Sequence, residues 1–199
     1  MSSPELLLGH NRVYQISIVG NSGSGKSTLG RYLSKHLQIP HLSIDELFWN
    51  PGWVPTQSDV LRDQVQAFIE SNPGGWIVDG NYIRMIGPIV QDAATDVLWL
   101  DPPLIINFWW VLRRTFCRLF LGEPSCAPGC HEEIRETLGS KDSILLYSLS
   151  HHGICRAEFG PIWERESIEA GKGKWRRFGG WGGDLGRWLG QVTSNIRTR

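Results

Sequence analysis

The residues from Gly20 to Thr28 fit the pattern G-x-x-x-x-G-K-[ST], which is typical of a phosphate-binding P-loop between a strand and a helix. Its glycines let successive backbone N–H groups point inward, and the helix that follows adds its positive N-terminal end. In this pattern the Lys26 ammonium reaches the β- and γ-phosphates, and the Ser27 hydroxyl binds the accompanying Mg²⁺. The sequence therefore predicts a magnesium-nucleotide site made by Gly20, Asn21, Ser22, Gly23, Ser24, Gly25, Lys26, Ser27 and Thr28.

Two aspartates follow short apolar runs further along the chain. Asp45 comes after His41–Ile44, and Asp79 comes after Trp76–Val78. An acid just past the carboxyl end of a parallel strand lies where open α/β sheets bind ligands. We expect Asp79 to be an outer-sphere Mg²⁺ ligand, and Asp45 to hold an acceptor hydroxyl or assist the Mg²⁺. The alternative for Asp45 is that it caps a helix.

Arginines and an aromatic residue near these acids are candidates for substrate binding. Arg84 is expected to face the same crevice and to fork onto a phosphate or carboxylate. Trp49 can stack on a ring, or it can belong to the core. Arg113, Arg114 and Arg118 lie on a predicted helix. Because neighbouring residues of a helix point about 100° apart, we expect only one of Arg113 and Arg114 to face the crevice.

The segment Gly122–Glu133 is rich in Gly, Pro and Cys and is bounded by helix-like stretches, which predicts a mobile lid over about residues 113–135. Residues 121–134 contain no arginine, so a clamp on the phosphates has to come from the flanks, including Arg135. A structural zinc site needs four ligands, and this segment offers three close together, namely Cys126, Cys130 and His131.

Strand-like and helix-like runs alternate after the P-loop. This alternation predicts one domain over residues 1–199 with a three-layer α/β/α P-loop NTPase fold, a five-stranded parallel sheet and a lid insertion. The order of the strands cannot be read from the pattern. The expected strands are Val13–Val19, His41–Ile44, Trp76–Val78, Asp96–Asp101 and Lys174–Phe178. The expected helices follow the P-loop, begin near Thr56, contain Phe108 to Leu119, cover 139–152 and contain Leu185 to Val192.

The bulk composition excludes some classes of partner. The chain is neutral overall, with twenty basic and twenty acidic residues, which argues against attraction to nucleic acid over the whole surface. Residues 172–199 hold seven basic residues and one acidic, a net charge of +6 that leaves −6 on residues 1–171. The apolar run Val97–Leu112 is broken by Asp101-Pro102-Pro103, so no membrane partner is expected. The absence of secretory features predicts a cytosolic or nuclear address and free cysteines.

Over residues 13–190 the chain resembles the small adenylate-kinase-like P-loop proteins called DNA topology-modulation proteins. The motifs that carry the resemblance are the P-loop, His41-Leu42 with Asp45, Phe48-Trp49, Pro51-Gly52-Trp53, the run Trp76–Tyr82, the Arg113-Arg114 pair, and a C-terminal strand followed by a Trp-bearing helix. The Asp79-Gly80 step is similar to the Asp-Gly-Phe-Pro-Arg motif of adenylate kinases. This implies that Asp79 lies near Mg²⁺ and Arg84 near the acceptor's phosphate. Here the arginine falls one place further on, and no arginine follows Asp45 as in adenylate kinases, so the acceptor stays open.

The resemblance and the P-loop together imply an ATP- and Mg²⁺-dependent kinase that transfers the γ-phosphoryl group to a small acceptor. The expected catalytic residues are Lys26, Asp45, Asp79, Arg113 and Arg114. The expected substrate-binding residues are Asp45, Trp49, Arg84, Arg118 and Arg135. One alternative is an NTP hydrolase or switch that binds nucleic acid through its basic tail, and another is an ATP-binding protein without turnover.

Overall fold

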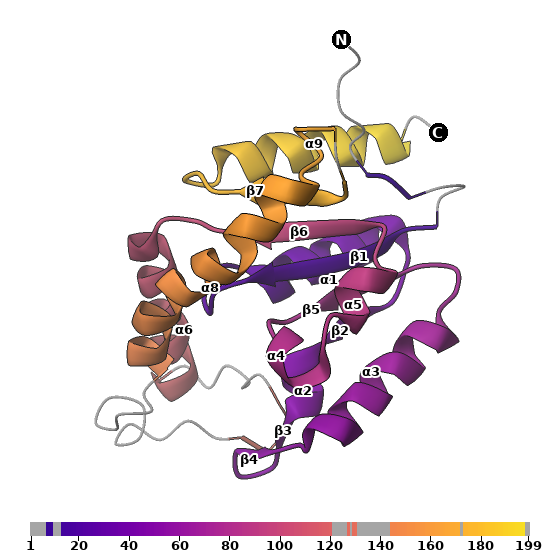
Figure 1. Cartoon of the computed structure of the whole chain (residues 1–199). Helices are drawn as coiled ribbons and strands as arrows, with labels where there is room; N and C mark the ends of the chain where they lie inside the picture. The colour runs from indigo at the N-terminus through magenta and orange to yellow at the C-terminus, as the bar shows by residue number, and fades with distance from the viewer. Residues whose placement is uncertain are drawn as a thin grey trace.

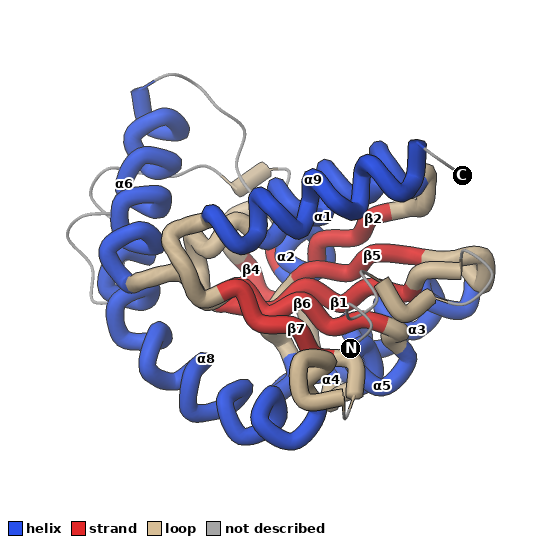
Figure 2. The backbone as a smooth tube through the Cα atoms, turned by 90° about the horizontal axis from the view of Figure 1, so that it is seen from above, coloured by secondary structure: helices blue, strands red, loops and turns tan. Residues whose placement is uncertain are grey.

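A computed structural model describes residues 7–9, 13–120, 127, 129–130, 144–171 and 173–197. Its centre is a sheet of five parallel strands in the order β2-β5-β1-β6-β7, which confirms the predicted sheet (Figure 2). The strands are β1 Gln15–Gly20, β2 His41–Ser43, β5 Trp76–Asp79, β6 Asp96–Leu100 and β7 Trp175–Phe178. The three central strands are almost wholly buried, because both faces of the sheet are covered, and this is why they read as continuous apolar runs.

Successive residues of a strand point to opposite faces of the sheet and pack into two separate hydrophobic cores. Ile16 and Ile18 pack on one face under α1 (Lys26–Leu37) and α9 (Gly183–Arg197). Trp76 and Val78 pack on the other face, with α3 (Ser58–Ser71), α4 (Ile83–Ile86), α5 (Ile89–Ala93) and α8 (Ile144–Glu166). This alternation follows from the two-residue period of a strand. The result is the predicted three-layer α/β/α arrangement (Figure 1).

Helix α6 (Leu104–Phe120) starts just after the end of β6 and packs against α8. Figure 1 shows the two helices side by side at the left, beyond the carboxyl ends of the strands. The P-loop lies between β1 and α1 at this same edge of the sheet. The topology therefore brings α6 to the mouth of the predicted phosphate site, where open parallel sheets bind ligands.

Two boundaries differ from the sequence predictions. The helix expected to begin near Thr56 starts at Ser58, because the Thr56 hydroxyl donates to the Leu47 carbonyl over 2.7 Å and does not cap the helix. The helix expected over 139–152 continues to Glu166, with Pro161 inside it. A proline inside a helix removes one backbone donor and crowds the carbonyl four residues earlier, and packing of α8 against the sheet and α6 outweighs this cost.

The connection between β2 and α3 was not predicted in detail. Ile44 begins the short helix α2 (Ile44–Phe48), and a small antiparallel hairpin follows, made by β3 (Trp49–Asn50) and β4 (Val54–Pro55). Its turn holds Gly52 and Trp53 at φ of 77° and 61°. In the described part of the chain, no helix is both long and apolar enough to cross a membrane.

Candidate functional site

The P-loop takes a backbone path that glycine permits. Gly20, Gly23 and Gly25 have φ of 146°, 78° and 93°. A Cβ on Gly20 would lie 2.3 Å from the Leu100 carbonyl oxygen, and one on Gly23 would lie 2.6 Å from the Asn107 carbonyl oxygen. The loop is thus closely packed on the end of β6 and on α6. Lys26, the first residue of α1, donates 3.0 Å from Nζ to the backbone oxygen of Asn21, which holds the ammonium over the loop.

Asp79 lies directly beneath the P-loop. The Ser27 hydroxyl donates to Asp79 Oδ1 over 3.0 Å, and His41 Nε2 lies 2.6 Å from Asp79 Oδ2. The carboxylate is buried. It sits one hydrogen bond from the hydroxyl that the P-loop pattern assigns to Mg²⁺, which is where an outer-sphere ligand belongs. The structure therefore brings together the two residues predicted for the metal.

His41 is a residue of this group that sequence reasoning missed. It begins β2, and β2 pairs with β5, the strand that ends at Asp79. Gly30 of α1 makes room for the imidazole, since a Cβ there would lie 2.3 Å from His41 Nε2. The contact depends on β2 and β5 being neighbours, and the sequence pattern does not give strand order.

Asp45 lies in the first turn of α2, as predicted just past the end of β2. The Tyr82 hydroxyl donates to Asp45 Oδ1 over 2.7 Å. The alternative role, that of a helix cap, is wrong, because the N-cap position of α2 is Ser43. The bond from Tyr82 fixes the carboxylate at the edge of the cavity described next.

A cavity of about 790 Å³ opens in front of the P-loop. It is walled by α1, α2, α6 and the segment that joins β7 to α9. Two exposed indoles, Trp110 on α6 and Trp181 between β7 and α9, contribute to its lining. Its polar and charged lining side chains include Ser22, Ser24, Lys26, Ser27, Thr28, Arg31, Ser43, Asp45, Glu46, Arg113, Arg114, Arg118 and Asp184.

All three predicted arginines of α6 line this cavity: Arg113, Arg114 and Arg118. The expectation that only one of Arg113 and Arg114 faces it is therefore wrong. The cavity runs along α6 and takes in a face wide enough for both neighbours, together with Trp110 and Cys117. The Arg113 guanidinium carbon also lies 5.8 Å from the centre of the Trp110 ring. Three arginines on one wall of a cavity that also contains the P-loop lysine make this part of the cavity suited to a polyanion.

Other predicted site residues lie elsewhere. Trp49 packs edge-on against Phe48 and Trp53, with ring centroids 4.6 Å and 5.4 Å away, and it is not part of the cavity lining. Arg84 is 68% exposed and pairs with Glu158 of α8 over 3.5 Å, also outside this lining. Their substrate-binding roles stay predictions. Arg135 lies outside the described residues.

Most of the predicted lid also lies outside the described residues, including Cys126 and His131. Residues 113–120, predicted as its flank, belong to α6. Cys130 donates from Sγ to the Asn50 carbonyl over 3.2 Å, and the Gly129 carbonyl accepts from Gly52 N–H over 3.1 Å. Among the residues that the structure describes, no group of three or more His, Cys, Asp or Glu side chains could hold a metal ion.

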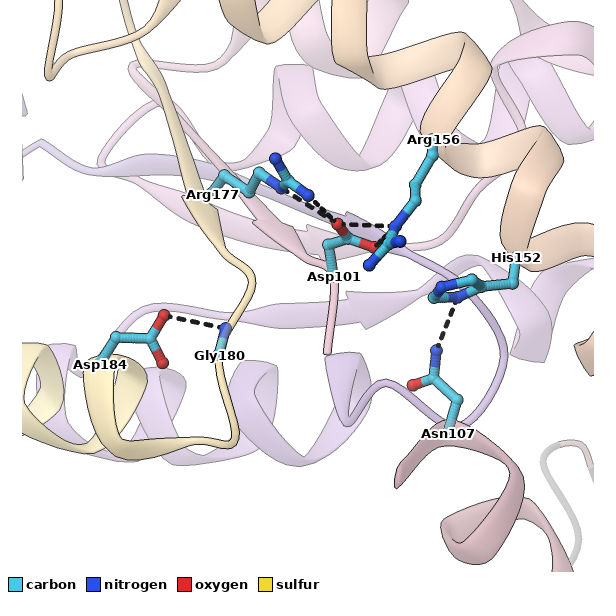
Figure 3. Close-up of polar contacts among 7 residues, drawn as sticks. All are labelled: Asp101, Asn107, His152, Arg156, Arg177, Gly180 and Asp184. Carbon is cyan, nitrogen blue, oxygen red and sulfur yellow. Dashed lines mark hydrogen bonds and ion pairs between the residues drawn. The ribbon is translucent and has the colours of Figure 1, made fainter. Parts of the chain in front are cut away.

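A buried carboxylate behind the cavity was not singled out from the sequence. Asp101, directly after β6, accepts from Arg156 Nε at 2.9 Å and 3.0 Å, and from Arg177 Nε at 3.0 Å (Figure 3). The Arg177 guanidinium also lies over Trp99 and Trp163, at 4.7 Å and 5.4 Å from the ring centres. This cluster ties β6, β7 and α8 together at the root of α6, so it positions the arginine-bearing wall of the cavity.

Two further titratable groups lie beside this cluster. His152 Nδ1 is 3.3 Å from the Asn107 amide nitrogen (Figure 3). Burial lowers the pKa of His152 below its usual 6.5, the Arg156 cation lowers it further, and Asp101 opposes them. Burial also raises the pKa of the Cys155 thiol, an effect that the Lys26 cation partly offsets. At neutral pH both groups are therefore uncharged.

Comparison with solved structures supports the fold. Shikimate kinase from Acinetobacter baumannii in complex with shikimate aligns with a TM-score of 0.52 at 14% identity, covering 94% of this chain and 96% of that one. Shikimate kinase from Bacteroides thetaiotaomicron aligns with a TM-score of 0.46 at 15% identity, covering 82% of this chain and 84% of that one. A protein from Eubacterium ventriosum ATCC 27560 aligns with a TM-score of 0.46 at 14% identity, covering 92% of this chain and 98% of that one. No protein-family model and no curated protein matches the chain. The first alignment shows that this chain and that shikimate kinase share a fold.

Proposed function

We propose that this protein is a phosphotransferase that uses Mg-ATP and transfers the γ-phosphoryl group to a small acceptor. The observation that carries the proposal is the hydrogen bond of 3.0 Å between Asp79 and Ser27, a residue that lines the same cavity as three arginines of α6. A P-loop serine beside a buried carboxylate is the donor set that holds Mg²⁺ with nucleotide phosphates. The residues present therefore fit the metal and the nucleotide.

Each side chain has a separate role in this proposal. Lys26 binds the β- and γ-phosphates, while Ser27 and Asp79 hold the Mg²⁺, which when bound neutralises phosphate charge. The arginines of α6 stabilise the negative charge that spreads over the transferring group. Asp45, held by Tyr82, orients the acceptor hydroxyl or accepts its proton.

We place the nucleotide base between Trp110 and Trp181. Both indoles are more than half exposed, and both line the cavity that contains the P-loop. Trp181 has two glycines on either side, Gly179-Gly180 and Gly182-Gly183, so its ring can adjust to a flat ligand. An aromatic face stacks on any base, so this arrangement supports binding of more than one kind of nucleotide.

The nucleic-acid alternative has less support. Among the described residues of 172–199, Lys174, Arg176 and Arg177 contact other elements of the fold. Lys174 donates to the carbonyls of Asp92 and Ala94, Arg176 lies 3.6 Å from Glu169, and Arg177 binds Asp101. The two ion pairs offset the charges of Arg176 and Arg177, which leaves less net charge for phosphates.

The test is ADP release from Mg-ATP in a screen of nucleoside monophosphates and small hydroxylated metabolites, with shikimate among them. We expect one acceptor class to raise ADP release sharply, and Lys26→Ala to abolish that release while the circular dichroism spectrum stays unchanged. Lys35→Ala, also on α1 but outside the cavity lining, is the matched control and should keep full activity. Slow ADP release that no acceptor accelerates would favour the hydrolase alternative. Unchanged release in Lys26→Ala would refute the site.

A further inference from the structure

Three side chains from α1 and β2 surround the carboxylate of Asp79 at the end of β5. The Ser27 hydroxyl donates to Oδ1 over 3.0 Å, and the Ser43 hydroxyl donates to the same oxygen over a longer 3.4 Å. His41 Nε2 lies 2.6 Å from the other oxygen, Oδ2. Because a carboxylate oxygen only accepts hydrogen bonds, Nε2 carries the hydrogen of this contact. The two oxygens of Asp79 therefore have separate partners.

The bond from His41 fixes the orientation of the Asp79 carboxylate. A carboxylate that is held at one oxygen only can turn about its Cβ–Cγ bond, because this torsion is broad. The imidazole holds Oδ2, so Oδ1 stays toward Ser27. Asp79 is 1% exposed and the His41 side chain is 10% exposed, so little water reaches the bond. A hydrogen bond to a charged group in such surroundings is stronger than one in water.

Gly30 makes the space that the imidazole needs. It lies three residues after Ser27 on α1, so the two residues share one side of the helix. Alanine would favour a helix more than glycine does. A Cβ at Gly30, however, would lie 2.3 Å from His41 Nε2 and 2.7 Å from His41 Cδ2. These atoms are the end of a side chain, so alanine at this position would displace the imidazole ring.

We propose that His41 is a positioning residue for the Mg²⁺ that accompanies ATP. It holds Oδ2 of Asp79 so that Oδ1 meets the Ser27 hydroxyl. Ser27 lines the cavity, and neither Asp79 nor His41 is among the described lining residues, so His41 acts through these two residues. The inference rests on the proposed function, because it concerns the metal of that site. Partners that orient the groups around a metal typically change its affinity about 10- to 100-fold when they are removed.

The test compares the dissociation constant of ATP in EDTA with that in excess Mg²⁺, measured on the full chain by titration calorimetry. The ratio of the two constants reports what the metal adds to ATP binding. His41→Leu removes the donor and should lower this ratio about tenfold, with the affinity for metal-free ATP unchanged. His41→Gln brings an amide that can donate to Oδ2, so it should keep most of the wild-type ratio. The control His151→Leu, on α8 and outside the cavity lining, should keep all of it.

Gly30→Ala tests the same contact with the imidazole still present. The added methyl group should displace the ring from Asp79 and lower the ratio, although alanine favours the helix. Gly190→Ala is the matched control, because Gly190 lies in α9 and has no atom within 4 Å of an added Cβ. It should keep the wild-type ratio. Melting temperatures confirm that all of these variants are folded.

Three outcomes would overturn the inference. A wild-type ratio well above one that stays unchanged in His41→Leu and Gly30→Ala would remove the role of His41 and leave the proposed function standing. Equal losses of affinity for ATP with and without Mg²⁺ in His41→Leu, not rescued in His41→Gln, would assign the ring to packing alone. A wild-type ratio of one would remove the metal site itself, and the proposed function would fail with it.

Discussion

Replacing Gly23 with alanine tests how closely the P-loop packs on α6. Gly23 has a φ of 78°, and an added Cβ would lie 2.5 Å from Val111 Cγ2 and 2.6 Å from the Asn107 carbonyl oxygen. Gly52, in the β3–β4 turn, has nearly the same φ of 77° and no atom within 4 Å of such a Cβ. The pair Gly23→Ala and Gly52→Ala therefore separates the cost of the backbone conformation from the cost of the contact.

The magnitudes follow from these two geometries. The left-handed conformation costs an L-residue roughly 1–2 kcal/mol, and both variants carry this loss. Only Gly23→Ala adds an overlap with a backbone oxygen and a buried methyl group, which costs roughly a further 1–3 kcal/mol if the loop stays in place. At about 2–4 °C per kcal/mol for a chain of this size, the melting temperature of Gly23→Ala should lie roughly 2–12 °C below that of Gly52→Ala.

The assay is thermal unfolding of wild type and both variants by circular dichroism, followed by titration with Mg-ATP. If the P-loop shifts to relieve the overlap, the stability loss shrinks and the affinity of Gly23→Ala for Mg-ATP falls, while that of Gly52→Ala stays at the wild-type value. Equal melting temperatures together with equal affinities in the two variants would refute the close packing of the P-loop on α6.

Three further predictions concern single side chains. Asp101→Asn should lower the free energy of unfolding by roughly 2 kcal/mol, measured by chemical denaturation. Breaking a fully buried ion pair costs more, but the arginine partners of Asp101 are partly exposed. The control Asp59→Asn, at an exposed position, should change the free energy of unfolding little. The folded pKa of His152 is below its unfolded value of about 6.5, so stability falls as the pH drops from about 6.5 toward the folded pKa, where the unfolded state binds more protons. His152→Gln should therefore lose less stability than wild type between pH 7 and 5, measured by melting temperature. Arg118→Ala should weaken Mg-ATP in a binding titration and Arg84→Ala should not, because only the first lines the cavity.

Each of these predictions has an outcome that contradicts it. Equal destabilisation by Asp101→Asn and Asp59→Asn would mean that the cluster in Figure 3 adds nothing to the fold. Parallel pH profiles for wild type and His152→Gln would show that the imidazole titrates as it does in the unfolded chain. A loss of Mg-ATP affinity in Arg84→Ala as large as that in Arg118→Ala would place Arg84 on the nucleotide side.

The fold was largely predictable because its signals are local. A strand buried on both faces reads as an apolar run, and Gly20 to Thr28 place a phosphate loop at the end of the first one, whatever the rest of the chain does. Local signals failed where a longer-range contact competed with them. Thr56 bonds the Leu47 carbonyl instead of capping α3, and packing carries α8 through Pro161.

The candidate site likewise has one part that local sequence signals predicted and another part that depends on longer-range contacts. The sequence by itself determined the P-loop and marked Asp79 and Asp45 by their positions after strands. Only the tertiary structure decided that His41 lies against Asp79, that Tyr82 holds Asp45, and that Asp101 joins two arginines from β7 and α8. These partners are between 37 and 76 residues apart in the chain. Their meeting depends on which strands and helices are neighbours, and that order is set by the packing of the whole domain, so no local pattern records it.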